Sequence, residues 1–105
     1  MTLNELKKKL DDLSWGEQME FEVSERDEEF AADMRDEIQK DIQQLAKQLT
    51  PLILDNLEKD KPYIFWVLRL SLCMDEDDSF GRGQRFYHHP DSRVRFWATK
   101  TLHTQ

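Results

Sequence analysis

Residues 24–52 read SERDEEFAADMRDEIQKDIQQLAKQLTPL, and this stretch indicates a helical protein. Its apolar residues recur every three or four positions, at Phe30, Met34, Ile38, Ile42, Leu45, Leu49 and Leu52. This spacing is that of one face of an α-helix. Ser24 stands before several acidic residues and is a candidate N-cap. Because Pro51 falls inside the pattern, we expect a bend there; the alternative is a restart in which Thr50 caps a segment to about Glu58.

The N-terminal flank begins with a second helical pattern. Thr2 and Glu5 match a capping box, and leucines at 3, 6, 10 and 13 predict a helix over 3–13. The sequence Ser14-Trp15-Gly16-Glu17 interrupts this periodicity. Residues 14–24 are therefore compatible with either an extended connector or a short helix.

The C-terminal flank predicts two further helices. Residues 63–74 follow a turn at Asp60-Lys61-Pro62 and are apolar on nearly every side, which indicates a central helix. Residues 75–83 break the helical pattern with four acids and two glycines. A last helix opens at Pro90-Asp91-Ser92 and carries Val94, Ala98 and Leu102.

Length and composition favour one small all-α domain. The chain has 105 residues, of which 38% are apolar and 35% charged, and only three glycines and three prolines supply turns. We expect a small bundle of antiparallel helix pairs with a long, kinked acidic helix. Its segments are a capping helix with a connector at 1–23, the long helix and the central apolar helix at 24–75, and a loop with the C-terminal helix at 76–103.

Charge is distributed unevenly. The net charge is −7, yet residues 17–41 hold eleven acids and three bases, a net −8, whereas 79–105 hold five bases and one acid, a net +4. Such polarity can steer association with a charged partner. The predicted acidic contact residues are Glu25, Glu28, Asp33 and Glu37. The alternative is that this stretch is the solvated face of a helix against which the basic tail packs.

Residues able to carry chemistry form no catalytic set. Cys73 is the single cysteine and lies in an apolar run, where we expect burial and a raised thiol pKa. Asp75, Asp77 and Ser79 imitate the start of a calcium loop, but Phe80 stands where such a loop requires glycine. His88-His89 offers two adjacent imidazoles, which rarely point at one ion. We therefore expect no catalysis, no metal and no cofactor.

A basic and aromatic segment near the C-terminus is the second candidate surface. Its predicted contact residues are Arg82, Arg85, Tyr87, His88, His89 and Arg93. Cations interleaved with aromatic rings are what a nucleic acid would use for phosphate contact and base stacking. A sequence pI near 4.9 opposes such binding, because an acidic chain repels phosphates.

A weak internal repeat points to a family. A shift of thirty residues places Ile64 on Val94, Leu68 on Ala98 and Leu72 on Leu102. The segment from His89 to Leu102 resembles the second helix of a HEAT repeat, and 49–64 resembles the preceding unit, so the resemblance covers about residues 45–103. It implies an α-solenoid fragment whose usual role is to present a surface to a protein partner, less often to nucleic acid.

These observations predict a non-catalytic protein–protein interaction module. The specific form that we expect is an acidic inhibitor or immunity-type protein, or an adaptor, that binds a basic partner. Alternatives are a nucleic-acid-binding module and a self-associating subunit. The N-terminus lacks a secretion signal, no segment is apolar enough to span a membrane, and one cysteine fits a reducing compartment, so we expect a cytoplasmic protein. Exposure of Trp15 and Tyr87 would favour an interface.

Overall fold

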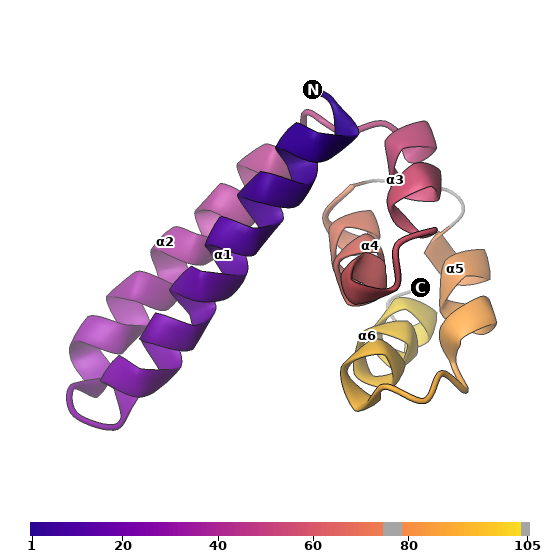
Figure 1. Ribbon diagram of the computed structural model, residues 1–105. Coiled ribbons are helices and arrows are strands. Elements are labelled where there is room, and N and C mark those ends of the chain that lie inside the picture. Colours follow the sequence, from indigo (N-terminus) through magenta and orange to yellow (C-terminus); the bar gives the residue numbers. More distant parts are fainter. Residues whose placement is uncertain (75–78, 104–105) are drawn as a thin grey trace. The chain divides into compact units, whose positions relative to one another are not determined.

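The computed structural model describes residues 1–74 and 79–103, and within them every regular element is helical (Figure 1). The predicted all-α class is confirmed. The elements in chain order are α1 (Leu3–Ser24), α2 (Glu28–Ala46), α3 (Pro51–Leu57), the 3₁₀ turn η1 (Lys61–Tyr63), α4 (Ile64–Cys73), α5 (Ser79–Phe86) and α6 (Ser92–His103). No helix among the described residues is long and apolar enough to cross a membrane.

The chain forms two compact units, Met1–Gln48 and Leu49–Gln105. The first, which we call the hairpin unit, consists of α1 and α2 packed side by side (Figure 1). The second, which we call the C-terminal unit, contains α3 to α6.

Helix α1 is longer than the sequence pattern predicts. The Thr2 hydroxyl caps it by accepting from the Glu5 amide at 3.2 Å, as the capping box requires. The helix then continues through Gly16 to Ser24, so an end near residue 13 and an extended connector at 14–24 are both wrong. Gly16 faces Ile38 of α2. Packing against a second helix outweighs the roughly 1 kcal/mol that a glycine costs inside a helix.

Helix α2 begins later and ends earlier than predicted. Its N-cap is Asp27, whose carboxylate accepts from the Phe30 amide at 3.1 Å. Ser24 instead donates its hydroxyl to the Phe21 carbonyl at 2.6 Å, so the prediction of Ser24 as N-cap is wrong. The two helices are joined by a short turn at 25–27.

The predicted bend at Pro51 is also wrong, and the alternative of a restart is correct. Helix α2 stops at Ala46, and Thr50 then caps α3 by accepting from the Ile53 amide at 3.4 Å. Thr50 has extended backbone angles, φ −116° and ψ 157°. A residue before proline is pushed toward such angles, and proline is favoured in the first turn that follows. These two preferences separate α2 from α3.

The C-terminal unit is built around α4 and α6. Ile64 and Leu68 of α4 form a buried cluster with Val94 and Ala98 of α6. These four residues belong to the two ladders related by the thirty-residue shift, so the two related segments pack on each other. Helix α4 contacts α3, α5 and α6, which confirms the predicted central position of 63–74 within this unit.

Helix α5 replaces part of the predicted irregular segment. Residues 75–78 lie outside the described residues, but the chain is helical from Ser79, with Gly81 and Gly83 inside the helix. Gly83 is buried against α6, where an added Cβ would lie 3.0 Å from the Ala98 carbonyl oxygen. The glycine thus permits a close approach of α5 to α6. From the local sequence alone, glycine predicts a break in the helix, so this role could not be predicted.

Candidate partner-binding surfaces

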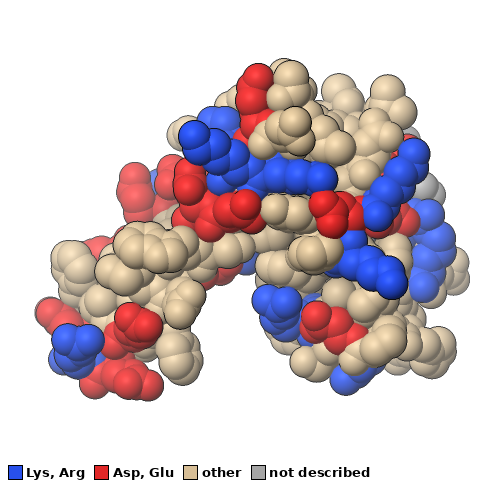
Figure 2. All heavy atoms as spheres, viewed as in Figure 1, with Lys and Arg blue, Asp and Glu red and all other residues tan. Residues whose placement is uncertain are grey.

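The acidic block of residues 17–41 occupies one end of the hairpin unit. The turn at 25–27 folds the second half of α1 against the first half of α2. Most of the eleven acids therefore lie near the closed end of the hairpin instead of lining one long helix, whereas Asp41 lies nearer the other end. Figure 2 shows acidic side chains among uncharged ones at this end.

The four predicted acidic contact residues occupy different positions there. Glu25 caps the C-terminus of α1, and Asp33 and Glu37 lie one turn apart on α2 with exposed side chains. Glu28 is engaged by Arg35 at 3.1 Å, and the same guanidinium lies 2.6 Å from Glu20. The two hydrogen-bonded carboxylates, Glu20 foremost, raise the pKa of Arg35 above its ordinary value. The charge of Glu28 is thus partly neutralised, whereas Asp33 and Glu37 face solvent.

A shallow depression lies between α1 and α2 toward the other end of the hairpin. It has a volume of about 260 Å³ and is lined by Lys9, Asp12, Leu13, Asp41, Gln44, Leu45 and Gln48. Its lining contains one cation, two carboxylates and two amides together with two leucines, so the depression offers both polar and apolar groups.

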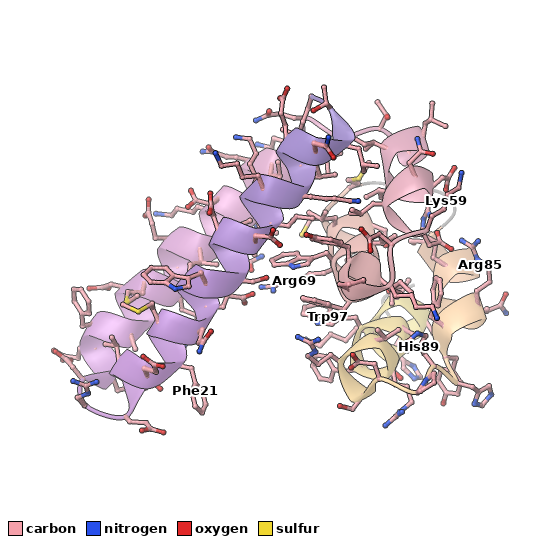
Figure 3. All side chains as sticks on the ribbon, viewed as in Figure 1. Phe21, Lys59, Arg69, Arg85, His89 and Trp97 are labelled. Carbon is pink, nitrogen blue, oxygen red and sulfur yellow. The ribbon has the colours of Figure 1, made fainter. Side chains whose placement is uncertain are left out.

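Large exposed apolar side chains accompany the acids. In the hairpin unit, Trp15 and Phe21 are each 65% exposed and Phe30 is 56% exposed. The helical ladder that defines α2 predicted an inward Phe30, and the structure places it outward. Phe21 projects from α1 on the side away from α2 (Figure 3). Rigid aromatic groups surrounded by charge are common anchors of protein interfaces.

The basic residues of α5 are engaged within the C-terminal unit. Arg82 is 1% exposed and binds Asp55 at 2.7 Å, together with Glu58 and the Pro51 carbonyl. Arg85 lies 3.0 Å from the same Glu58. The guanidinium of Arg82 therefore ties α5 to α3 and is not part of the surface. Its sequence neighbourhood gave no sign of this, because its acceptors lie more than twenty residues earlier.

Of the remaining residues of that segment, Tyr87, His88 and His89 lie between α5 and α6, and Arg93 lies in the first turn of α6. Tyr87 is 42% exposed and meets His88 edge to face at 5.0 Å. His89 accepts the Asp91 amide at its Nδ1 atom at 3.1 Å. Arg93 lies 4.7 Å from the Phe65 ring centroid and 3.6 Å from Asp91. Among the described residues no group of three or more His, Cys, Asp or Glu side chains is placed to hold a metal ion.

A cation–aromatic cluster on α4 and α6 was not found from the sequence. Arg69 lies 4.8 Å from the Trp66 centroid and 5.1 Å from that of Trp97, and Figure 3 shows Arg69 beside Trp97. Lys100 lies 4.9 Å from Phe96 and 5.2 Å from Trp97. The spacing of three or four residues within each helix could have indicated three of these four contacts. The contact between α4 and α6 depends on the fold.

Cys73 is the last residue of α4 and is exposed, so the predicted buried position is wrong. Partial desolvation still raises the pKa of its thiol, opposed by the positive charge of Arg69 one turn earlier. The predicted direction of the shift is confirmed. Asp75 and Asp77, the first residues of the suspected calcium loop, lie outside the described residues.

No protein-family model, curated protein or solved structure matches this chain. The two candidate surfaces differ in how much of their charge is free to meet a partner. The acidic end of the hairpin unit exposes both charge and aromatic area. The basic segment has its cations engaged with carboxylates, carbonyls or rings.

Proposed function

We propose that this protein is a non-catalytic interaction module that binds a basic protein partner through the acidic end of its hairpin unit. The observation that carries the proposal is the joint exposure of acids and aromatic side chains there. Complementary charge accelerates association and selects the partner, whereas desolvated aromatic anchors supply affinity. An inhibitor or immunity-type protein that blocks a basic, nucleic-acid-handling enzyme has these properties, and an adaptor would share them.

The division of charge between the units supports this choice. The hairpin unit has seven basic and fourteen acidic residues, a net −7, whereas the C-terminal unit has eight of each. The whole net charge of the chain is therefore carried by the hairpin unit. Its field favours a cationic partner at distances up to about 8 Å in physiological salt.

The C-terminal unit fits the role of a HEAT-like support. Helices α3 and α4, then α5 and α6, follow one another as two helix pairs, and α4 packs on α6. This order supports a HEAT-like interpretation of the segment after residue 49. With its single cysteine, the protein suits a reducing compartment such as the cytoplasm.

The test compares two variants of equal net charge in a capture experiment. One neutralises the predicted acids as Glu25→Gln, Glu28→Gln, Asp33→Asn and Glu37→Gln. The control converts four exposed glutamines outside the acidic block, as Gln43→Lys, Gln44→Lys, Gln48→Lys and Gln84→Lys. Each variant is four charge units less negative than the wild-type chain.

The tagged wild-type protein and both variants are incubated with lysate of the source cells, and the proteins and nucleic acids retained are identified. We expect a basic protein that the wild type and the control retain and that the neutralised variant loses. Its dissociation constant, measured with purified protein, should rise about tenfold or more in the neutralised variant alone. If both variants lose the basic protein equally, its capture by the wild type reflects only nonspecific charge attraction. If nucleic acid is retained, the basic segment is favoured as the binding surface. Capture of the chain by itself would favour a self-associating subunit.

A further inference from the structure

Several apolar residues lie on one side of the hairpin unit, toward its acidic end. Asp12 of α1 and Asp41 of α2 both line the depression between the helices. Met19 lies seven residues after Asp12, and Met34 lies seven residues before Asp41. Seven residues are two helical turns, so both methionines are on the side that holds the depression, two turns nearer the connecting turn.

Two aromatic residues extend the same side. Trp15 precedes Met19 by four residues, and Phe30 precedes Met34 by four. In α-helices, side chains four apart share a face. Trp15 and Phe30 are 65% and 56% exposed, whereas the two methionines are partly buried. We call Trp15, Met19, Phe30 and Met34 the apolar patch; it covers roughly one turn of each helix.

Acidic side chains border the patch on α2. Asp33 follows Phe30 by three residues, Glu37 follows Met34 by three, and both are exposed. The salt-bridged Glu28 does not belong to this border, because Arg35 holds it. The patch is thus apolar in the middle and anionic at its edge.

We propose that the apolar patch binds an amphipathic basic helix of the partner protein. Apolar side chains of that helix contact Trp15, Met19, Phe30 and Met34, and its Lys or Arg side chains face Asp33 and Glu37. Two adjacent helices offer a surface on which a third helix packs through residues spaced three and four apart. Methionines suit such a site because their flexible side chains adapt to different apolar groups.

Charge selects this occupant over a second copy of the chain. Residues 17–41 carry a net −8, and two copies meeting at this surface would bring two such blocks together. A cationic helix instead reduces the repulsion among the acids. This inference rests on the proposed function and specifies the surface and the chemistry of the partner.

The direct test uses two synthetic helical peptides of about 18 residues with equal positive charge. The first carries leucines at positions i, i+3, i+4 and i+7 and lysines elsewhere; the second has glutamine in place of every leucine. Methyl groups of the four methionines are labelled with ¹³C and observed by NMR. Met19 and Met34 report on the patch, while Met1 and Met74 serve as internal references. We expect the leucine peptide to shift the Met19 and Met34 signals and to bind at least about tenfold more tightly than the glutamine peptide.

Matched variants separate the patch from general exposure of aromatic residues. The double substitution Trp15→Ala with Phe30→Ala should weaken binding of the leucine peptide by about tenfold or more. It should leave the affinity for the glutamine peptide unchanged. Phe21→Ala is the control, because Phe21 is equally exposed but lies off the patch. Circular dichroism should show unchanged helix content in both variants, since the substituted side chains are exposed.

The outcomes distinguish the two proposals. Equal binding of both peptides, with no effect of the Trp15 and Phe30 substitutions, would overturn the patch and leave charge-guided capture intact. Shifts confined to Met1 or Met74 would also overturn it, because the peptide would then bind elsewhere. If neither peptide binds the wild-type chain, both the patch and a cation-binding hairpin are wrong.

Discussion

The hairpin unit and the C-terminal unit use charged residues in opposite ways. In the C-terminal unit, Arg82 is buried between carboxylates, and Arg69 lies over two indole rings. In the hairpin unit, Asp33 and Glu37 stand in solvent beside exposed aromatic groups. Charge in the C-terminal unit connects helices, whereas in the hairpin unit most of it faces outward. The first set stabilises the packing of its unit; under the proposed function, the second set is the one that contacts the partner.

The largest effect on stability is expected from removal of the Arg82 guanidinium. Arg82→Met leaves Glu58, which is only 13% exposed, without that cation. We expect the C-terminal unit to lose about 3 kcal/mol of unfolding free energy, because a broken buried ion pair is costly and leaves Glu58 with only the exposed Arg85 as its cation. Urea unfolding followed by Trp66 and Trp97 fluorescence, in a Trp15→Phe background, measures this unit.

Arg85→Met is the matched control for that measurement. Arg85 pairs with the same Glu58, but its side chain is 53% exposed. Exposed pairs contribute only about 0–1 kcal/mol. Equal losses in the two variants would contradict the assignment of Arg82 as the link between α3 and α5.

Two helical glycines should respond with opposite signs. An added Cβ at Gly83 lies 3.0 Å from the Ala98 carbonyl oxygen and 3.2 Å from Leu102 Cγ, so Gly83→Ala should cost about 1–2 kcal/mol. At Gly16 the nearest atom is Ile38 Cδ1 at 3.7 Å, an ordinary contact, so Gly16→Ala should stabilise the hairpin unit by up to about 1 kcal/mol. Thermal unfolding of both variants checks the signs. A destabilising Gly16→Ala would mean that α1 and α2 are packed more tightly than this distance indicates.

Sequence periodicity and local capping signals predicted several helix starts, although they missed the Asp27 cap of α2 and favoured a bend at Pro51 over the observed restart. The Thr2 cap, the turn before α4 and the start of α6 follow from a few adjacent residues. They failed where a distant segment decides. Gly16 and Gly83 were predicted to interrupt the helical pattern, but each lies inside a helix that packs against another helix.

The candidate surface was predictable in composition and not in position. The acidic block is evident from residues 17–41, and Trp15 was a candidate anchor from its charged surroundings. The exposure of Phe30 could not be predicted from the periodicity, which places Phe30 on the same helical face as the partly buried Met34 and Ile38. Likewise, the engagement of Arg82 depends on acceptors in α3 that no local pattern links to it.

Salt should affect the two units differently. The hairpin unit carries a net −7, and screening of its self-repulsion should stabilise it by roughly 0.5 kcal/mol as ionic strength rises from about 0.01 M to 0.1 M. The C-terminal unit, with equal numbers of acids and bases, should change less or weaken slightly. Amide hydrogen exchange resolved by residue measures both units in one sample. Lower protection of α2 amides at the higher salt concentration would contradict this division of charge.

The smallest expected effect concerns the acid dependence of α6. The Asp91 carboxylate accepts the Arg93 amide at 2.8 Å, and this backbone bond, followed by the positive charge of Arg93, lowers the pKa of Asp91 despite partial desolvation. A lowered folded pKa means that the stabilisation is complete above the ordinary aspartate value of about 3.9 and is lost as the pH falls through the folded pKa. An NMR titration of the Arg93 amide should therefore show a midpoint below that value, and Asp91→Asn should abolish the transition. A midpoint at or above the ordinary value would show that the charged form of Asp91 does not cap α6. Only backbone–backbone hydrogen bonds would then stabilise the first turn of α6.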